Sequence, residues 1–342
     1  MNPAGQAQLA APDAPARDAP VLAVRDLRVR FRTKGRPVDA VNGLSYRLHA
    51  GRMLAIVGES GSGKSVSSRA LMGLLPTSAQ VSGSAVLDGV ELVGMGEAQL
   101  RRRRGADIAM VFQDPARSLN PTMRVGVQVT ESVRAHARID KAAARARAVE
   151  LLELVRLPDP ARRFHEYPHQ LSGGMRQRVM IAIALAGEPR LLIADEATTA
   201  LDVTTQAQIM ALLVELQERL GTAVIMISHD LGLAASYAHD VVVMYAGRAV
   251  ECAPVETLFA HVRMPYTQAL LDAVPRLERT PHSLLPVVPG QPPDLTRLPP
   301  GCPFAPRCAS ATPQCDAAPE LLEQEPGHAW ACWHPIRGDA PS

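Results

Sequence analysis

The segment GESGSGKS, residues Gly58–Ser65, has residue types and spacing suited to holding phosphate. It matches the pattern G-x-x-x-x-G-K-[ST] in full, and it follows an apolar strand-like run and precedes a helix-like one, the context that this pattern requires. Glycines let the backbone approach an anion closely, and successive N–H groups then point at it. The start of the helix adds the positive end of its dipole. We therefore expect a phosphate-binding loop whose backbone groups come from Gly58, Ser60, Gly61, Ser62 and Gly63.

Lys64 and Ser65 complete the chemistry of this loop. Lys64 is expected to bring a compact cation to the β- and γ-phosphates of a nucleotide, and Ser65 is expected to offer its hydroxyl to Mg²⁺. Lysine is rare in the chain, since only Lys34 and Lys141 accompany Lys64. A chance glycine-rich turn is the competing interpretation, and the combination of motif and context argues against it. The predicted ligand is ATP with Mg²⁺.

A second magnesium element is expected at the end of another strand. The run LLIADE, Leu191–Glu196, passes from four apolar residues to two carboxylates. Asp195 is expected to hold Mg²⁺, and Glu196 to orient or deprotonate an attacking water. A lone Asp-Glu pair is equally compatible with ordinary surface charge. Behind an apolar run in a chain with a phosphate loop, the pair indicates a catalytic site.

These groups need a scaffold, and the sequence predicts an α/β one. The short runs RLLIADE and TAVIMISHD are apolar and end in polar residues, as buried parallel strands do. The N-terminal run VLAVRDLRVRF alternates as a strand does, and residues 98–157 have a helical composition. Strands that alternate with helices indicate an α/β core.

The length and composition bound the possible classes of protein. A chain of 342 residues suits one large domain and a smaller one. Its 36 Lys and Arg against 34 Asp and Glu argue against a dedicated nucleic-acid binder, so no nucleic-acid partner is expected. No apolar run approaches the roughly 18 residues of a membrane span, and no secretory signal opens the chain. The expected compartment is the cytoplasm.

Composition also divides the chain into three parts. Residues 1–20 are rich in Ala and Pro and are expected to be a disordered tail. Residues 21–262 hold the strand and helix patterns. Residues 263–342 are rich in proline, and we expect a small appended domain there with little regular structure.

The segment LSGGMRQR, Leu171–Arg178, narrows the class. Ser172 is suited to cap a helix, and Gly173 and Gly174 would expose backbone N–H groups at its start, again a phosphate-binding feature. A second such helix start is puzzling in a monomer. The segment resembles the signature motif of ABC-type ATPases, in which the signature of each subunit closes over the nucleotide of its partner.

The other motifs of that family occur in the same order. Gln113 in VFQDP resembles the Q-loop residue, which implies a catalytic and magnesium-contacting role. TALD, ending at Asp202, resembles the D-loop near the dimer contact, and His229 in ISHD resembles the switch histidine that touches the γ-phosphate. Phe31 stands where the family stacks an aromatic residue on adenine. The resemblance implies a P-loop NTPase, RecA-like core with an antiparallel β part, a helical subdomain at about residues 113–170 and a small C-terminal Cys-rich extension.

Further segments resemble one subgroup, the ATPases of oligopeptide and dipeptide importers. FQDPARSLNP, MPYTQALLDAVP and PGQPPDL are similar to its sequences, and Met175 in the signature is common there. The resemblance implies an ATP-hydrolysing subunit at the cytoplasmic face of the cell (inner) membrane. Its implied partners are two membrane permease subunits, a second homologous ATPase in a heterodimer, and an extracytoplasmic substrate-binding protein. The ATPase of a nickel or other small-solute importer is the alternative, since this subgroup shares the motifs.

Four of the five cysteines gather at Cys302, Cys308, Cys315 and Cys332. Disulfides are rare in a reducing cytoplasm, so unconnected thiols or a metal site remain. The spacing C-x5-C-x6-C-x16-C lacks the C-x-x-C knuckle of zinc ribbons, and four thiolates also suit an iron–sulfur cluster. The resemblance implies a [4Fe–4S] cluster at these four cysteines, with Zn²⁺ as the alternative.

Other classes share part of this pattern. Chromosome-structure ATPases need a long coiled-coil insertion, which the sequence lacks, and translation-factor ATPases usually carry two cassettes. A non-enzymatic, nucleotide-gated scaffold would require the loss of a catalytic residue, and Glu196 and His229 are both present. An exporter ATPase would not need the C-terminal extension.

Overall fold

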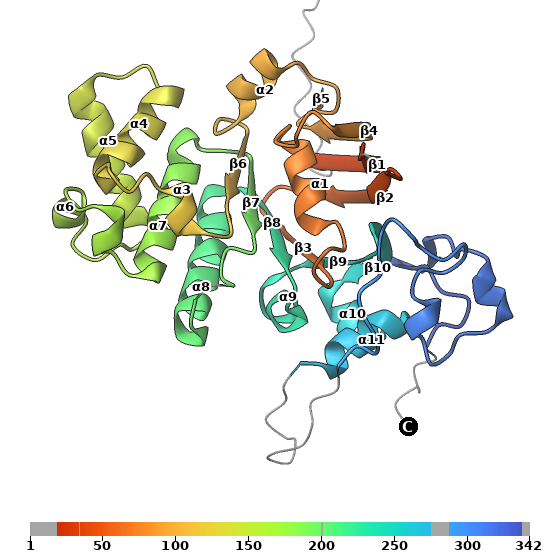
Figure 1. Cartoon of the computed structure of the whole chain (residues 1–342). Helices are drawn as coiled ribbons and strands as arrows, with labels where there is room; N and C mark the ends of the chain where they lie inside the picture. Colours follow the sequence, from red (N-terminus) through yellow and green to blue (C-terminus); the bar gives the residue numbers. More distant parts are fainter. Residues whose placement is uncertain (1–18, 34, 200, 275–286, 337–342) are drawn as a thin grey trace, which may run out of the picture.

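An eight-stranded sheet forms the centre of the protein in a computed structural model that describes residues 19–33, 35–199, 201–274 and 287–336 (Figure 1). The strand order is β11-β12-β10-β9-β3-β8-β7-β6, and the five strands from β9 to β6 pair in parallel. In chain order the strands are β3 (Met53–Val57), β6 (Ile108–Val111), β7 (Leu191–Asp195), β8 (Ala223–Ser228), β9 (Asp240–Tyr245), β10 (Arg248–Pro254), β11 (Leu322–Glu325) and β12 (His328–Trp330). The apolar runs predicted as buried parallel strands are confirmed as β7 and β8.

The central strands are apolar throughout because both faces of the sheet are covered. In β3, the side chains of Met53, Ala55 and Val57 join the cluster on the helical side. Leu54 and Ile56 point the other way and join the second cluster, under the N-terminal sheet. A strand buried on both faces has no polar alternation, as the sequence showed.

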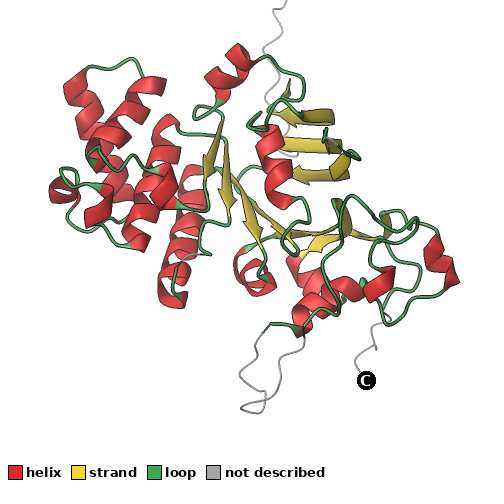
Figure 2. Ribbon diagram, viewed as in Figure 1, coloured by secondary structure: helices red, strands yellow, loops and turns green. Residues whose placement is uncertain are grey.

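The second sheet is antiparallel, with strand order β2-β1-β4-β5, and α1 lies between it and the central sheet (Figure 2). It is formed by β1 (Leu22–Phe31), β2 (Val38–Leu48), β4 (Ala79–Leu87) and β5 (Val90–Glu91). This sheet is the antiparallel part expected near the N-terminus. Most of the expected tail, residues 1–20, lies outside the described residues.

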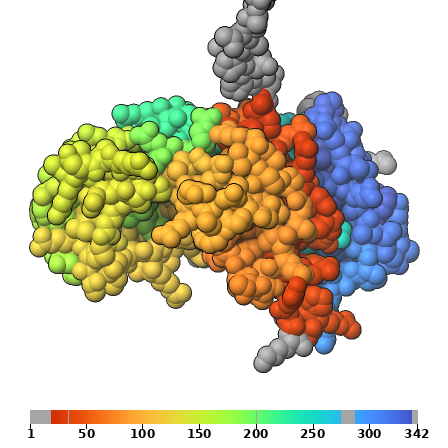
Figure 3. Space-filling view, turned by 90° about the horizontal axis from the view of Figure 1, so that it is seen from above, coloured from red at the N-terminus to blue at the C-terminus, as the bar shows by residue number. Residues whose placement is uncertain are grey.

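Helices cover the rest of the core. They are α1 (Lys64–Leu71), α2 (Glu97–Arg103), α3 (Pro115–Ser118), α4 (Val125–His136), α5 (Lys141–Leu154), α6 (Pro160–Arg163), α7 (Gly173–Ala184), α8 (Val203–Leu220), α9 (Leu231–Tyr237), α10 (Val255–Ala260) and α11 (Pro265–Asp272). Helices α3–α6 occupy the segment proposed as a helical subdomain. Figure 3 shows this group and the C-terminal extension at opposite ends of the molecule. Within the described residues, no helix combines the length and apolar character that crossing a membrane requires.

The C-terminal extension is joined to the central sheet, which the sequence did not predict. After α11, its described residues form loops and two short 3-10 turns, Ala305–Arg307 and Pro313–Asp316, as expected of a proline-rich segment. Its hairpin β11–β12, however, pairs with β10 through Glu251 and Trp330 and so continues the core sheet.

A buried carboxylate fixes this junction. Glu251 and His328 are both fully buried, and Nε2 of His328 lies 2.9 Å from Oε1 of Glu251. The same carboxylate accepts hydrogen bonds from the backbone N–H groups of Arg263 at 2.7 Å and Met264 at 3.2 Å. Three donors from the extension and the segment leading to it therefore depend on one side chain.

We expect Glu251→Ala to lower the free energy of unfolding by about 3 kcal/mol, because it leaves buried donors without an acceptor. The thermal midpoint measures this change. The control is Glu215→Ala, which removes the surface ion pair of Glu215 with Arg156 at 2.6 Å and should cost less than about 1 kcal/mol. Equal midpoints for the two variants would contradict a special role for Glu251.

Candidate functional site

The predicted phosphate loop connects β3 to α1, and two of its glycines are required by the backbone around them. Gly58 has φ +150°, and a Cβ there would lie 2.2 Å from the carbonyl oxygen of Met244 in β9. Gly63 has φ +100°, and a Cβ would lie 2.3 Å from the carbonyl oxygen of Ala40 in β2. Any side chain at either position would displace a strand, so the loop keeps its close curl only with glycine.

Lys64 lies inside the curl of this loop. Its side chain is buried, and Nζ donates hydrogen bonds to the carbonyl oxygens of Gly58 at 2.7 Å and Glu59 at 2.8 Å. Burial lowers the pKa of Lys64, and the nearby carboxylates of Glu196, Asp195 and Glu59 act in the opposite direction. The ammonium group is thus surrounded by groups that favour its charged form, at the place where the loop N–H groups would hold an anion.

The two oxygen donors predicted for Mg²⁺ meet across the sheet. Ser65 in α1 and Asp195 at the end of β7 are 130 residues apart, and Oγ of Ser65 donates to Oδ1 of Asp195 at 2.6 Å. Asp195 is buried, and its other oxygen lies 3.5 Å from Nη2 of Arg69. A hydroxyl and a carboxylate side by side are the kind of oxygen ligands that Mg²⁺ takes, so the residues fit the ion.

The three side chains predicted for hydrolysis also converge. Nε2 of Gln113 donates to Oε2 of Glu196 at 2.7 Å, and Nδ1 of His229 lies 3.9 Å from Oε1. Glu196 has φ +48°, an uncommon conformation for a residue other than glycine and one that is often found at functional sites. Glu196 and His229 line a cavity of about 90 Å³ next to the ends of β7 and β8. The amide of Gln113 thus fixes one oxygen of the Glu196 carboxylate, and the other oxygen faces the imidazole of His229.

The predicted signature motif and the predicted D-loop contact each other, at a location separate from the phosphate loop. Ser172 caps α7 by accepting a hydrogen bond from the N–H of Met175 at 3.3 Å. Gly174 allows α8 to approach, since a Cβ there would lie 2.5 Å from Cγ2 of Thr205. Asp202 caps α8 and accepts from the N–H of the same Thr205 at 2.9 Å.

Among the described residues, the signature motif and the D-loop are not bonded to the phosphate loop of the same chain. Across the described residues, no hydrogen bond or ion pair links Leu171–Arg178 or the start of α8 to Gly58–Ser65. Gly173 instead packs near Cδ2 of Leu201, at 3.3 Å from a Cβ built on the glycine. Ala200, within the predicted D-loop, lies outside the described residues.

Phe31 is the last residue of β1 and is partly buried. It pairs with Val38 of β2 and Ala79 of β4. Because β2 touches the phosphate loop through Ala40, Phe31 lies one strand away from that loop. Its stacking on adenine stays a prediction.

Sequence reasoning missed two residues that hold the phosphate loop from outside. Tyr266 accepts a hydrogen bond from the N–H of Glu59 at 2.8 Å, and Arg307 forms an ion pair with the Glu59 carboxylate at 2.6 Å. Both residues come from the chain beyond residue 262. The sequence separation of 248 residues between Glu59 and Arg307 leaves no local pattern that could have indicated the contact.

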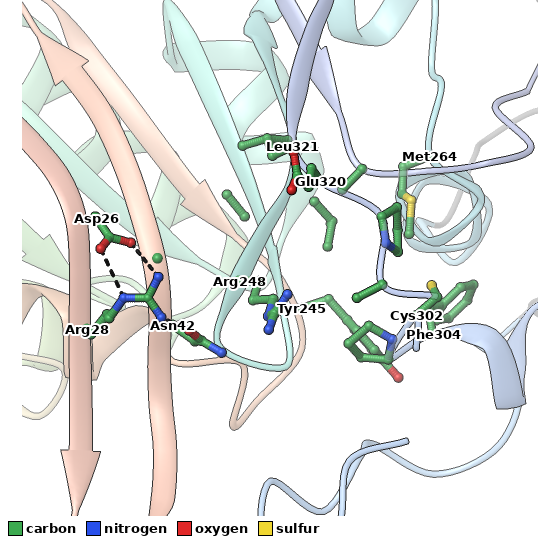
Figure 4. Close-up of a pocket in the computed structure, with 17 residues that line it drawn as sticks. Asp26, Arg28, Asn42, Tyr245, Arg248, Met264, Cys302, Phe304, Glu320 and Leu321 are labelled. Carbon is green, nitrogen blue, oxygen red and sulfur yellow. Dashed lines mark hydrogen bonds and ion pairs between the residues drawn. The ribbon is translucent and has the colours of Figure 1, made fainter. Parts of the chain in front are cut away.

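A separate cavity of about 400 Å³ lies between the N-terminal sheet and the extension (Figure 4). Its walls include Asp26, Arg28, Tyr245 and Phe304. Arg28 is already paired with Asp26 at 2.7 Å. None of the predicted nucleotide-site residues lines it.

The four clustered cysteines line one small cavity in the extension, together with Met264 and Trp333. Each is a free thiol. Burial raises the pKa of Cys302 and Cys308, and raises that of Cys332 to about 11. In the part of the chain that the structure describes, no group of three or more His, Cys, Asp or Glu side chains is arranged to hold a metal ion.

Comparisons with known proteins match both parts of the chain. The family described as ABC transporter matches residues 41–199, and the family described as oligopeptide/dipeptide transporter, C-terminal region, matches residues 250–315. The oligopeptide transport ATP-binding protein OppD of Haemophilus influenzae is 51% identical over 92% of this chain and 97% of that protein. OppD of Salmonella typhimurium is 51% identical over 92% of this chain and 94% of that protein.

A solved structure of an ATP-binding cassette is also similar to this chain. The ATP-binding cassette MJ0796, in a dimeric post-hydrolysis state bound to ADP and Pi, is 28% identical and superimposes with a TM-score of 0.62. The match covers 68% of this chain and 98% of that one.

We expect Lys64→Ala to weaken MgADP binding at least about tenfold, because the buried ammonium group is the cation nearest to the loop N–H groups. Equilibrium titration of the purified chain with MgADP measures the change. The matched control is Lys141→Ala, at an exposed lysine that begins α5, and it should bind as the unmodified chain does. Unchanged affinity for Lys64→Ala would exclude a phosphate-binding role for the lysine.

Proposed function

The chain belongs to the ABC transporter family, in its group of oligopeptide transport ATP-binding proteins, and we propose that it is the ATPase subunit that powers an oligopeptide or dipeptide importer. The observation that carries the proposal is that the likeness to OppD extends through the C-terminal region of residues 250–315. The substrate named for the relatives favours peptides over the alternative, a nickel or other small-solute importer.

The residues at the ends of the parallel strands perform the proposed hydrolysis of ATP to ADP and phosphate. The loop N–H groups and Lys64 bind the phosphates, and Ser65 and Asp195 would hold Mg²⁺, with Gln113 on the other side of the site. Mg²⁺, when bound, neutralises charge on the β- and γ-phosphates. Glu196 orients the attacking water and accepts its proton, because its carboxylate is held by Gln113 and faces His229. His229 is placed to contact the γ-phosphate.

A second ATPase subunit completes the site. Among the described residues, the start of α7, with Ser172, Gly173 and Gly174, makes no hydrogen bond or ion pair with the phosphate loop of its own chain, which supports its availability to the nucleotide of a partner. Val203, next to Asp202, is an apolar residue that is 83% exposed, and we propose that the partner subunit covers it. Closure of the pair over ATP acts as a lid that excludes water. We propose a heterodimer of two homologous ATPases.

The remaining partners follow from the transport activity. The described helices do not span a membrane, so the chain acts through two permease subunits at the cytoplasmic face of the cell (inner) membrane. Gln113 and the helices that follow it are the proposed contact region. An extracytoplasmic substrate-binding protein delivers the peptide to the permeases.

We further propose that Cys302, Cys308, Cys315 and Cys332 hold a [4Fe–4S] cluster, with Zn²⁺ as the alternative metal. Four thiols from one segment face a shared cavity, and thiolate is the ligand that both metals take. A bound metal would replace the thiol protons and staple a proline-rich segment that has little apolar core of its own.

In membranes that contain the permeases and both ATPases, we expect peptide-loaded binding protein to stimulate ATP hydrolysis. We expect Glu196→Gln to retain ATP binding and to lower single-turnover hydrolysis at this subunit by about 100-fold or more, because an amide cannot accept the proton. Stimulation by nickel and not by peptides would favour the alternative importer. Near-normal turnover of Glu196→Gln would contradict its proposed role.

For the cysteines, we expect the protein purified without oxygen to be brown, with about four irons per chain and visible iron–sulfur absorption. Cys308→Ser should lose both the iron and the colour. Cys252→Ala is the matched control, because Cys252 lies in β10 outside the group and its replacement should leave the iron content unchanged. A colourless protein that contains zinc would establish the alternative.

A further inference from the structure

We propose that Arg307, in the cysteine-containing extension, is a positioning residue of the nucleotide site: it binds the Glu59 carboxylate of the phosphate loop and keeps that carboxylate from Lys64. This inference rests on the nucleotide-binding role proposed for the loop. It goes beyond that role by making nucleotide affinity depend on a contact from the extension.

The contact between Arg307 and Glu59 is a two-pronged ion pair. Nη1 of Arg307 lies 2.6 Å from Oε2 of Glu59, and Nη2 lies 2.9 Å from Oε1. The Arg307 side chain is 6% exposed and that of Glu59 is 20% exposed, so solvent screens the pair only weakly. Paired hydrogen bonds of this geometry are stronger and more directional than a single surface ion pair.

Arg307 is itself held in place on its other sides. Nη1 also donates to the hydroxyl of Tyr245 at 3.2 Å, and the guanidinium lies 5.8 Å from the ring centre of Tyr245 and 5.9 Å from that of Phe304. These two rings stand in the wall of the cavity between the N-terminal sheet and the extension (Figure 4). Arg307 ends a 3-10 turn and immediately precedes Cys308, so its position is tied to the cysteine segment.

Glu59 is fixed at its backbone as well as at its carboxylate. Its N–H donates to the hydroxyl of Tyr266 at 2.8 Å, and its carbonyl oxygen accepts from Nζ of Lys64 at 2.8 Å. Tyr266 is fully buried and lies in α11. Of the three side chains that hold this loop residue, two therefore come from outside residues 41–199, the part that matches the ABC transporter family.

The electrostatic reason for the arrangement is competition for Lys64. The Glu59 carboxylate lies near enough to favour the charged form of the lysine. Without Arg307, the freed carboxylate would have Lys64 as a neighbouring cation, and it would place an uncompensated negative charge beside the phosphates. Arg307 opposes both effects, because its two hydrogen bonds hold the Glu59 carboxylate and partly neutralise its charge.

The test is a four-variant cycle measured as the dissociation constant of MgADP on the full-length chain purified without oxygen. MgADP is used because its binding requires neither hydrolysis nor permeases nor peptide. We expect Arg307→Ala to raise the dissociation constant about tenfold, within the usual range for coupling between distinct sites. When Glu59 is already replaced in Glu59→Gln, adding Arg307→Ala should change it by less than about twofold, because the competing charge is absent. Arg307→Lys should fall between, since one ammonium group cannot form both hydrogen bonds.

A control variant, Arg263→Ala, separates this role from a purely structural role in holding the extension on the core. Arg263 also lies beyond residue 262 and pairs with Glu325 at 2.6 Å, yet no described hydrogen bond or ion pair joins its side chain to the phosphate loop. Arg263→Ala should lower the thermal midpoint and leave MgADP affinity within about twofold. The proposal is overturned if Arg307→Ala binds MgADP normally, if it weakens binding equally with and without Glu59→Gln, or if Arg263→Ala weakens it as much. Failure of peptide-stimulated import would leave these results unaffected.

Discussion

Parallel pairing of the central strands is the constraint on which the proposed site depends. Parallel strands end at the same edge of a sheet, and ligands of α/β proteins bind at that edge. The phosphate loop follows β3, Gln113 follows β6 by two residues, Glu196 follows β7 directly and His229 follows β8 directly. Residues that are scattered over the sequence thus meet because each comes after the carboxyl end of a neighbouring strand. The bond between Ser65 and Asp195 is the clearest case, since it joins the elements after β3 and at the end of β7.

The extension lies beside β10, at one side of the central sheet. Its hairpin continues the central sheet past β10, and the buried Glu251 ties the hairpin to the segment before α11. This placement brings Tyr266 and Arg307 to the phosphate loop. The extension thereby packs on the core, and it returns two contacts to the predicted phosphate loop.

The sequence predicted features whose motif lies within a short stretch of residues, and it did not predict contacts between distant residues. The phosphate loop, the carboxylates after β7 and the histidine after β8 each stand next to an apolar run, so residue type and spacing sufficed to predict each strand and the polar residues that follow its end. The co-location of the four cysteines followed from their type and spacing. The pairing of β12 with β10 and the contact of Arg307 with Glu59 could not be predicted, because they join residues 77 or more positions apart with no shared motif. Spacing likewise does not determine how the four cysteine side chains are oriented, and among the described residues they are not arranged to hold a metal ion.

Several parts of this site act on the charge of Lys64. Three carboxylates surround the buried ammonium group, those of Glu196, Asp195 and Glu59. Left unpaired, each would compete with a nucleotide for Lys64. Each instead has another donor: Gln113 for Glu196, Ser65 for Asp195, and Arg307 for Glu59. The first two donors belong to the cassette and the third belongs to the extension. The availability of Lys64 for phosphate is therefore a property of the whole chain, and a cassette without its extension would lose the donor that occupies Glu59.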